Sequence, residues 1–334
     1  MRLAMSILVR DEADIIEANV RYHAACGVSR FIVTDNGSVD GTREILEKLS
    51  KEFTLSVIDE PSMTIDQDLW VTRMAKVLAE ENTSDWVINN DADEFWIPQH
   101  DELLTDTIER HLKQSPQHGE RVGVLCCPRF NIVPSQQVVG RQGYSFRNNR
   151  YKVLKDWTDA SQMLDLDEDT AALMPDGQHV IIRVLSGKVI TRLDGLASVD
   201  MGNHGAEHEL ETVYIDDIEI AHYPIRGFAQ FERKVINYGS SMENNDRFGP
   251  MISLHLRRWY ASYRKGALRQ EYDAIVLSDA MLSLLCRSGF WRSQTLVSSI
   301  TIRIRGDHIK LRSSCFFVSI DSDFNTRIYI RTLR

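Results

Sequence analysis

Residues 3–35, LAMSILVRDEADIIEANVRYHAACGVSRFIVTD, decide the fold class. The apolar run Leu3–Val9 has the length of a buried strand, and Glu12–Cys26 has helical character up to Gly27, a residue type that commonly ends helices. Phe31–Thr34 is a second apolar strand. A strand, a helix and another strand in this order predict a βαβ unit with parallel strands.

The alternation of strands and helices continues to about residue 96. Helices are predicted over Thr42–Phe53 and Asp66–Glu80, because apolar residues recur on one helical face, and strands over Thr54–Ile58 and Trp86–Ile88. Strands separated by helices of this length favour a mostly parallel sheet flanked by helices. We therefore expect an α/β fold of Rossmann-like type.

The remainder of the chain is less regular. Helical patterns return over Phe228–Tyr238 and Ser253–Lys265. Near the end, the alternating run Ile300–Arg305 precedes a Gly-Asp pair, which predicts a terminal hairpin. We therefore divide the chain into an α/β domain, residues 1–228, and a mainly helical carboxy-terminal region, residues 229–334.

The net charge argues against one class of partner. The 334 residues carry a formal charge of −9 at pH 7, whereas nucleic-acid binding needs a dense positive surface. An anionic ligand remains compatible, because a metal ion, arginines and backbone amides hold phosphate locally. From Ser293 onward there are seven Lys or Arg and three Asp or Glu. This basic tail is compatible with peripheral membrane contact, although a solvated sheet edge is the simpler interpretation.

The cysteines and the apolar runs predict a cytoplasmic protein. The five cysteines are an odd number without metal-ligand spacing, and Cys126 and Cys127 lie in an apolar run, where free thiols behave as small hydrophobic side chains. The apolar run before Arg10 is too short for a secretory signal peptide, and no stretch has the length of a transmembrane helix. We expect at most a peripheral association with membranes.

Each of the four predicted strands ends in polar residues. In chain order these are Arg10–Glu12, Asp35–Asn36, Asp59–Glu60 and Asp91–Glu94. In open α/β sheets, ligands bind beyond the carboxyl ends of the strands. We therefore expect the active site at this edge of the sheet.

The strongest chemical signal is the D-x-D motif Asp91-Ala92-Asp93, which follows the last of these strands. Alternate residues of an extended chain point to one side, so both aspartates could face a single cation. Carboxylate oxygens suit Mg²⁺ or Mn²⁺, and such a cation would neutralise a diphosphate leaving group. Alone the pattern is weak, because short acidic pairs also occur in solvated turns and helix caps.

A resemblance to a known family strengthens this interpretation. TDNGSVDGTREIL, residues 34–46, resembles the nucleotide-binding signature of glycosyltransferase family 2. The segment from SILVRDEAD to DNGSVDGT, together with VINNDADEFW, is similar to the branch of that family with a VRDEAD-like loop and a DADEF motif. The resemblance covers residues 1–96 and, more weakly, HYPIRGFAQFERKVINYG at residues 222–239.

The resemblance implies a metal-dependent glycosyltransferase of GT-A type, with residues 1–228 as its catalytic domain. The enzyme would use Mn²⁺ or Mg²⁺ and a nucleotide-sugar donor, in the first instance a UDP-sugar. The acceptor would be a hydroxyl group of a glycan or of another molecule. Most members of family 2 invert the configuration of the transferred sugar, so inversion is implied as well.

The resemblance also implies roles for individual residues. The residues expected to contact the nucleotide sugar are Val9, Arg10, Glu12, Asp35, Asn36, Ser38, Arg73 and Asp91. Asp91 and Asp93 would bind the metal, and His222 of the late His-Tyr motif would be a third ligand. His204, which lies between glycines, is an alternative to His222 as the third metal ligand. Arg73 could instead be an ordinary surface residue of its helix that does not contact the nucleotide.

The catalytic base is left open. Inversion requires a carboxylate that accepts the proton of the acceptor hydroxyl. Asp93 and Glu94 are candidates at the site, although Glu94 is better suited to supporting the metal-binding turn. The acidic cluster Asp165–Asp169 contains further carboxylates, but such clusters are usually solvated loops.

Two other functions remain as alternatives. A nucleotidyltransferase also combines an α/β sheet with metal-binding carboxylates, but it would have a Gly-rich loop after its first strand, and VRDEAD contains no glycine. A catalytically silent binding protein of the same fold is the second alternative. The presence of both Asp91 and Asp93 argues against it.

Overall fold

The fold is described from a computed structural model of the chain. The described residues are 1–62, 66–100, 102–114, 119–139, 151–153, 184–243, 253–280, 282–283, 291–293, 301–305 and 308–312. The acidic cluster Asp165–Asp169 lies outside the described residues. Cys26, Cys126 and Cys127 are buried free thiols.

The strands and helices are as follows. The strands are β1 (Leu3–Val9), β2 (Val28–Asp35), β3 (Leu55–Asp59), β4 (Trp86–Asp91), β5 (Glu94–Pro98), β6 (Val122–Val133), β7 (Tyr151–Val153), β8 (Val184–Arg192), β9 (Leu196–Val199), β10 (Ala206–His208), β11 (Glu211–Tyr214), β12 (Ile218–His222), β13 (Trp291–Ser293), β14 (Thr301–Arg305) and β15 (His308–Arg312). The helices are α1 (Ile16–Ala25), α2 (Thr42–Leu49), α3 (Gln67–Glu81), α4 (Leu104–Gln114), α6 (Gln136–Val139), the short 3₁₀ helix η3 (Met201–Asn203), α9 (Phe228–Glu243), α10 (Leu254–Arg264) and α11 (Leu268–Ile275).

One mixed sheet forms the centre of the molecule, in the order β13-β7-β6-β8-β4-β1-β2-β3, with β5, β11 and β12 joined at its side. Strands β3, β2, β1 and β4 run parallel, so their carboxyl ends lie at one edge. The antiparallel strand β8 then separates β4 from β6. The sheet is therefore parallel over the predicted strands and mixed beyond them.

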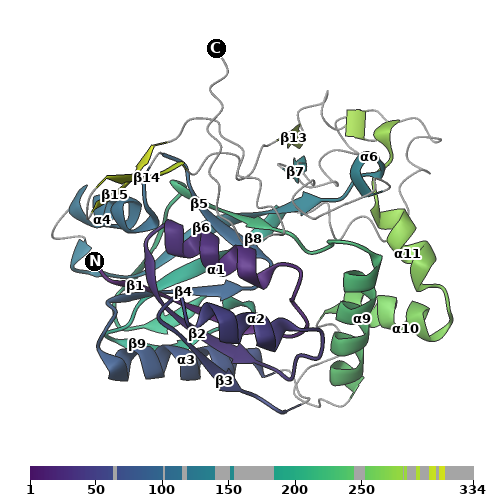
Figure 1. The fold of residues 1–334 in the computed structure, drawn as a ribbon, viewed down its shortest axis with the longest axis horizontal. Coiled ribbons are helices and arrows are strands. Elements are labelled where there is room, and N and C mark those ends of the chain that lie inside the picture. The colour runs from purple at the N-terminus through teal and green to yellow at the C-terminus, as the bar shows by residue number, and fades with distance from the viewer. Residues whose placement is uncertain are drawn as a thin grey trace.

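Helices cover both faces of this sheet (Figure 1). Successive side chains of a strand point to opposite faces, and β1 is apolar on both. Leu3 and Met5 pack in the core formed with α1, α2 and α4, whereas Ala4 packs in a second core with α3. The expected α/β architecture, a sheet with parallel strands flanked by helices, is confirmed.

Strand β12 brings a distant part of the chain to the D-x-D turn. It pairs antiparallel with β5 and parallel with β6. This register places His222 opposite Glu94 on one side and Asn131 on the other. The late His-Tyr motif therefore lies beside the end of β4.

The helices α9, α10 and α11 pack around a core of their own, on the right of Figure 1. Phe231 of α9 meets Trp259 of α10 edge to face, with ring centroids 5.0 Å apart, and Tyr272 of α11 packs beside them. Val133 of β6 joins this core. Further along, β14 and β15 form an antiparallel hairpin. No helix within the described ranges is long and apolar enough to cross a membrane.

Candidate active site

A cavity of about 130 Å³ lies at the carboxyl edge of the parallel strands. Of the residues predicted to bind the nucleotide or the metal, those that line it are Val9, Arg10, Glu12, Asn36, Asp91, Asp93 and His222. The loops after β1 and β2, the D-x-D turn and the end of β12 thus meet around one space. We name it the central cavity.

The loop after β1 is held by side chains around it. Asp11 has a positive φ of 56°, and its carboxylate accepts hydrogen bonds from the Val39 amide and from Nδ2 of Asn237 on α9, both at 2.8 Å. The Asp11 amide donates to Oγ of Ser38 at 3.0 Å. These contacts hold the loop with Val9, Arg10 and Glu12 at the cavity.

The end of β2 is equally well held. Nδ2 of Asn36 donates to the carbonyl oxygens of Glu60 (3.0 Å) and Ser62 (2.6 Å), and Arg10 donates to its Oδ1 (3.2 Å). Oδ1 of the buried Asp35 accepts the Ser38 amide at 3.0 Å. Asp35 and Ser38 therefore support this wall, although they do not line the central cavity itself.

Asp91, the first aspartate of the D-x-D turn, is surrounded by donors. Its Oδ1 accepts hydrogen bonds from Gln67 of α3 at 3.0 Å and from Asn203 of η3 at 3.2 Å. Its Oδ2 forms an ion pair with Lys188 of β8, whose side chain is fully buried. Sequence reasoning did not single out any of these three partners.

Asp93, the second aspartate, lies among positively charged groups. Its Oδ2 is 3.0 Å from Nζ of Lys234, 3.4 Å from Nε2 of His222 and 3.6 Å from Nη1 of Arg226. Burial opposes ionisation, but Lys234, His222 and Arg226 outweigh it and hold the pKa of Asp93 well below its usual value. Asp93 is therefore a carboxylate in the folded protein.

Glu94 has no access to the cavity. It is fully buried, with Arg129 at 2.8 Å from one carboxylate oxygen and Lys188 at 2.9 Å from the other. Burial would raise its pKa, but Lys188 and Arg129 together lower it. Since Lys188 also pairs with Asp91, this lysine joins the two ends of the D-x-D-E segment.

His222 faces Asp93 through Nε2, which lies 3.4 Å from Oδ2 of that carboxylate. Its Nδ1 lies 2.8 Å from Oδ1 of Asn131, so both ring nitrogens have a polar neighbour. Burial lowers the pKa of His222, and the charge of Asp93 and a hydrogen bond with it oppose this effect. An imidazole nitrogen and a carboxylate oxygen at this separation are groups that one divalent cation takes as ligands.

The donor set of the D-x-D turn therefore fits a divalent cation on the Asp93–His222 side. Within the described part of the chain, however, no three His, Cys, Asp or Glu side chains already surround a common ion position. The oxygens of Asp91 are turned toward Gln67, Asn203 and Lys188 instead.

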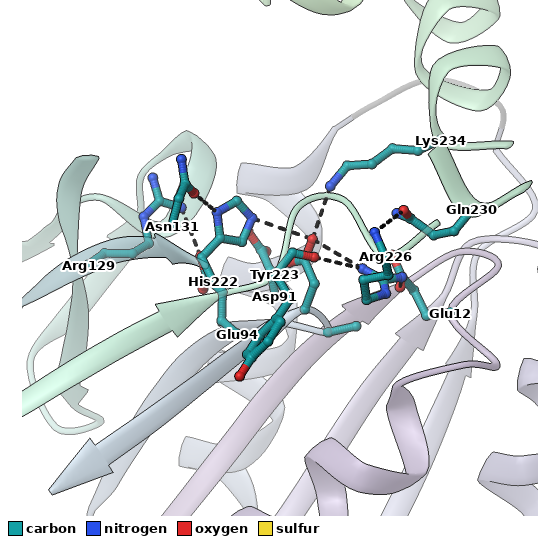
Figure 2. A network of polar contacts seen from close by, with 12 residues as sticks. Glu12, Asp91, Glu94, Arg129, Asn131, His222, Tyr223, Arg226, Gln230 and Lys234 are labelled. Atoms are coloured by element: carbon teal, nitrogen blue, oxygen red, sulfur yellow. Dashed lines mark hydrogen bonds and ion pairs between the residues drawn. The ribbon is translucent and has the colours of Figure 1, made fainter. Parts of the chain in front are cut away.

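Arg226, in the segment between β12 and α9, ties the loop after β1 to the D-x-D turn. Its guanidinium is fully buried and pairs with Glu12 (Figure 2). It also lies 2.8 Å from Asp14 and 3.6 Å from Asp93. Burial raises the pKa of Glu12 to about 7 against the opposing effect of Arg226, and the nearby Asp93 adds to the rise. The predicted nucleotide-binding residue Glu12 thus belongs to the same charge network as the predicted metal ligand.

One face of α9 forms the far wall of the cavity, which sequence reasoning missed. The residues that it contributes are Gln230, Lys234, Asn237, Tyr238 and Ser241. Their spacing of three or four residues is that of a helical face, here a polar one. This polar stripe in HYPIRGFAQFERKVINYGSS was the available signal, but nothing in the sequence alone shows what the stripe faces.

Two predicted residues lie elsewhere. Arg73 is half-exposed, pairs with Glu60 at 3.1 Å and lines a groove between α3 and β9. His204 is exposed, and its Nδ1 lies 2.9 Å from the carbonyl oxygen of Gly187 and 3.2 Å from Oγ of Ser186. Neither residue lines the central cavity.

A helix-flanked sheet with charged loops and a D-x-D turn at its carboxyl edge is the arrangement expected of a glycosyltransferase, and the family comparison agrees. The family model for glycosyltransferase family 92 matches residues 4–262, well over half of the chain. The chain therefore belongs to glycosyltransferase family 92, and the expectation of a glycosyltransferase is confirmed. The narrower resemblance to family 2 is not confirmed by this match.

Other comparisons add little. No protein of curated function matches the sequence. Among solved structures, residues 1–349 of Staphylococcus aureus TarS in complex with UDP-GlcNAc match with 11% identity and a TM-score of 0.38, over 94% of this chain and 100% of that one. Glucosyl-3-phosphoglycerate synthase from Mycobacterium tuberculosis, in complex with Mn²⁺, UDP and glucosyl-3-phosphoglycerate, matches with 17% identity and a TM-score of 0.32, over 74% and 81% of the two chains.

Proposed function

We propose that this glycosyltransferase moves a sugar from a nucleoside-diphosphate donor, in the first instance a UDP-sugar, to a hydroxyl group of a glycan or similar acceptor. The observation that carries the proposal is the central cavity. It joins the loops after β1 and β2 to Asp91, Asp93 and His222 in one space. A nucleotide held by the loops would place its diphosphate at the D-x-D turn.

The donor site follows from this arrangement. Val9, Arg10, Glu12 and Asn36 line the side of the cavity at β1 and β2, where base and ribose would bind. Asp35 and Ser38 would hold that wall in place, as their contacts with the loop indicate. We infer that the motifs shared with family 2, VRDEAD and DNGSVDGT, serve donor binding in this way.

Mn²⁺ or Mg²⁺ is the proposed cofactor, with Asp91, Asp93 and His222 as its protein ligands. The 3.4 Å approach of Nε2 of His222 to Oδ2 of Asp93 supports this donor set. When bound, such a cation supplies charge neutralisation for the diphosphate that leaves. Asn131 orients the imidazole, and Gln67 and Asn203 hold the carboxylate of Asp91 at the cavity.

Inversion of configuration is part of the proposal, with the acceptor hydroxyl attacking the sugar directly. The burial of Glu94 between Lys188 and Arg129 favours a supporting role for this carboxylate over contact with substrate.

The proposed domain boundary at residue 228 separates α9 from the sheet, yet residues on both sides of it line the cavity. A cytoplasmic location and membrane contact by the basic tail remain predictions.

The test is calorimetric titration of UDP, with Mn²⁺ and with a chelator, into the wild-type protein and Asp93→Asn. We expect tighter binding with Mn²⁺, and a loss of at least about tenfold in Mn²⁺-dependent affinity for the variant, because a charged ligand of the cation is removed. Glu44→Gln, which removes an exposed carboxylate from α2, is the matched control and should bind like wild type. Binding that needs no metal and is unchanged in Asp93→Asn would contradict the metal proposal. A hydrolysis screen over nucleotide sugars would then identify the donor.

A further inference from the structure

Each aspartate of the D-x-D turn is paired with a lysine, but the two lysines differ in their surroundings. Lys188 is fully buried and bridges Asp91 and Glu94, so it belongs to the framework of the turn. Lys234 comes from α9, its side chain is 26% exposed, and it lines the central cavity. Of these two lysines, Lys234 is the one that lines the cavity and can contact a ligand there.

Lys234 occupies the side of Asp93 that a cation would use. Its Nζ donates to Oδ2 of Asp93 at 3.0 Å, and Nε2 of His222 lies 3.4 Å from the same oxygen. The charged side chain of Lys234 is thus already paired with this carboxylate. An ammonium and a divalent cation on one carboxylate oxygen repel each other.

The helix that carries Lys234 is held in place independently of this ion pair. Asn237, one turn further along α9, donates to Asp11, and Gln230, one turn earlier, accepts the Arg226 amide at 3.0 Å. A lysine has a flexible four-carbon stem, so its ammonium can change partner while the helix stays fixed.

Building on the proposed function, we propose that Lys234 exchanges partners: it neutralises Asp93 in the free enzyme and moves to the diphosphate of the donor when the donor and its cation bind. Before binding, the ammonium of Lys234 neutralises Asp93 in place of the cation. After binding, it contacts the diphosphate. The exchange gives Asp93 a positively charged partner in both states, in addition to the buried Arg226, and burial makes such partners important for a carboxylate. It also gives the diphosphate an ammonium from the α9 wall.

Lys234→Met keeps the length of the side chain and removes its charge. In this variant, we expect the affinities for Mn²⁺ and for UDP to change in opposite directions. Affinity for Mn²⁺ without nucleotide should increase, because the competing ammonium is gone. Affinity for UDP in saturating Mn²⁺ should fall about tenfold or more, because a charge-assisted hydrogen bond to the diphosphate is lost. Both are measured by calorimetry, with thermal unfolding as a check on folding.

Arg233→Met is the matched control. It removes one positive charge from the neighbouring position of α9, where the side chain is 42% exposed and 3.9 Å from Asp40. Both affinities should stay within about twofold of wild type, as for substitutions away from a binding contact.

The outcomes separate this inference from the proposed function. Loss of both affinities in Lys234→Met, or UDP affinity equal to wild type, overturns the exchange and leaves the donor site standing. Unchanged Mn²⁺ affinity with weaker UDP binding also overturns it, because Lys234 would then bind diphosphate without competing for Asp93. A wild-type protein that binds none of UDP, GDP and CDP overturns the proposed function and the exchange with it.

Discussion

Single residues hold the D-x-D turn through buried charges that compensate one another. Glu94, Lys188 and Arg129 are almost inaccessible to water, and each has an oppositely charged partner. Such groups stabilise a protein only as a set, because removal of one member leaves its partner buried and unpaired. Replacing one carboxylate oxygen of Glu94 by an amide nitrogen should therefore destabilise the turn.

Glu94→Gln should lower the free energy of unfolding by about 3–5 kcal/mol at pH 7, as urea denaturation would show. The folded-state pKa of Glu94 is lowered, so its contribution is present above its ordinary value of 4.5 and is lost as the pH falls below it. The difference between wild type and variant should therefore shrink below about pH 4.5. Glu52→Gln removes an exposed partner of Arg21 and should have an effect below about 1 kcal/mol. A variant as stable as wild type at pH 7 would argue against the buried network.

Among the secondary-structure elements, regular hydrophobic patterns in the sequence predict which segments are strands or helices. They predict less accurately the residues at which those elements begin and end. Strand β1 has the predicted bounds Leu3–Val9. Helix α1 is predicted from Glu12 but begins at Ile16, because Ile15 has non-helical dihedral angles, with φ at −130° and ψ at −28°. The antiparallel insertion of β8 between β4 and β6 was not predicted, because such pairing depends on partners far apart in sequence.

The close contact of α9 with α10 depends on Gly239. A Cβ atom at this position would lie 2.1 Å from the ring of Tyr260. Gly239→Ala should therefore push the helices apart, lower the free energy of unfolding by about 1–3 kcal/mol and weaken UDP binding, because Lys234 and Asn237 move with α9. Ser240→Ala on the same helix should change stability by less than about 0.5 kcal/mol. Wild-type stability and UDP affinity in Gly239→Ala would show that α9 has room to adjust.

At the scale of the whole molecule, the pH dependence of stability should carry the signature of a buried histidine. His23 of α1 accepts the Trp96 amide through Nε2 and donates through Nδ1 to the Asn19 carbonyl, so it joins α1 to β5. Burial lowers its pKa to about 3 from an ordinary value of 6.5. The unfolded chain thus takes up a proton between these values, and the folded chain does not.

The free energy of unfolding should fall by up to about 1.4 kcal/mol per pH unit from this residue as the pH drops from 6.5 toward 3. Urea denaturation at pH 7, 6 and 5 measures the slope. His23→Gln should be less stable at pH 7 but have a shallower slope, whereas His100→Gln, at an exposed position, should keep the wild-type slope. Equal slopes for wild type and His23→Gln would show that His23 is protonated in the folded protein.

The site was predictable only where chemistry follows a strand end. The D-x-D turn and the loops after β1 and β2 stand out because a strand pattern precedes them, and His222 because it ends a strand-like run. Lys188, Lys234 and Asn203 come from elements whose position depends on the folded sheet. Nothing local to those residues distinguishes them from ordinary surface lysines or loop residues.

The path of the chain through β12 and α9 has a consequence for protein synthesis. Strands β1 to β4 are complete early in the sequence, but the cavity closes only when residues 222–241 arrive. Since chains fold from the amino terminus as they emerge from the ribosome, a nascent chain can pair its first strands while the pocket still lacks a wall. A chain whose translation stops before α9 would therefore lack one wall of the nucleotide pocket.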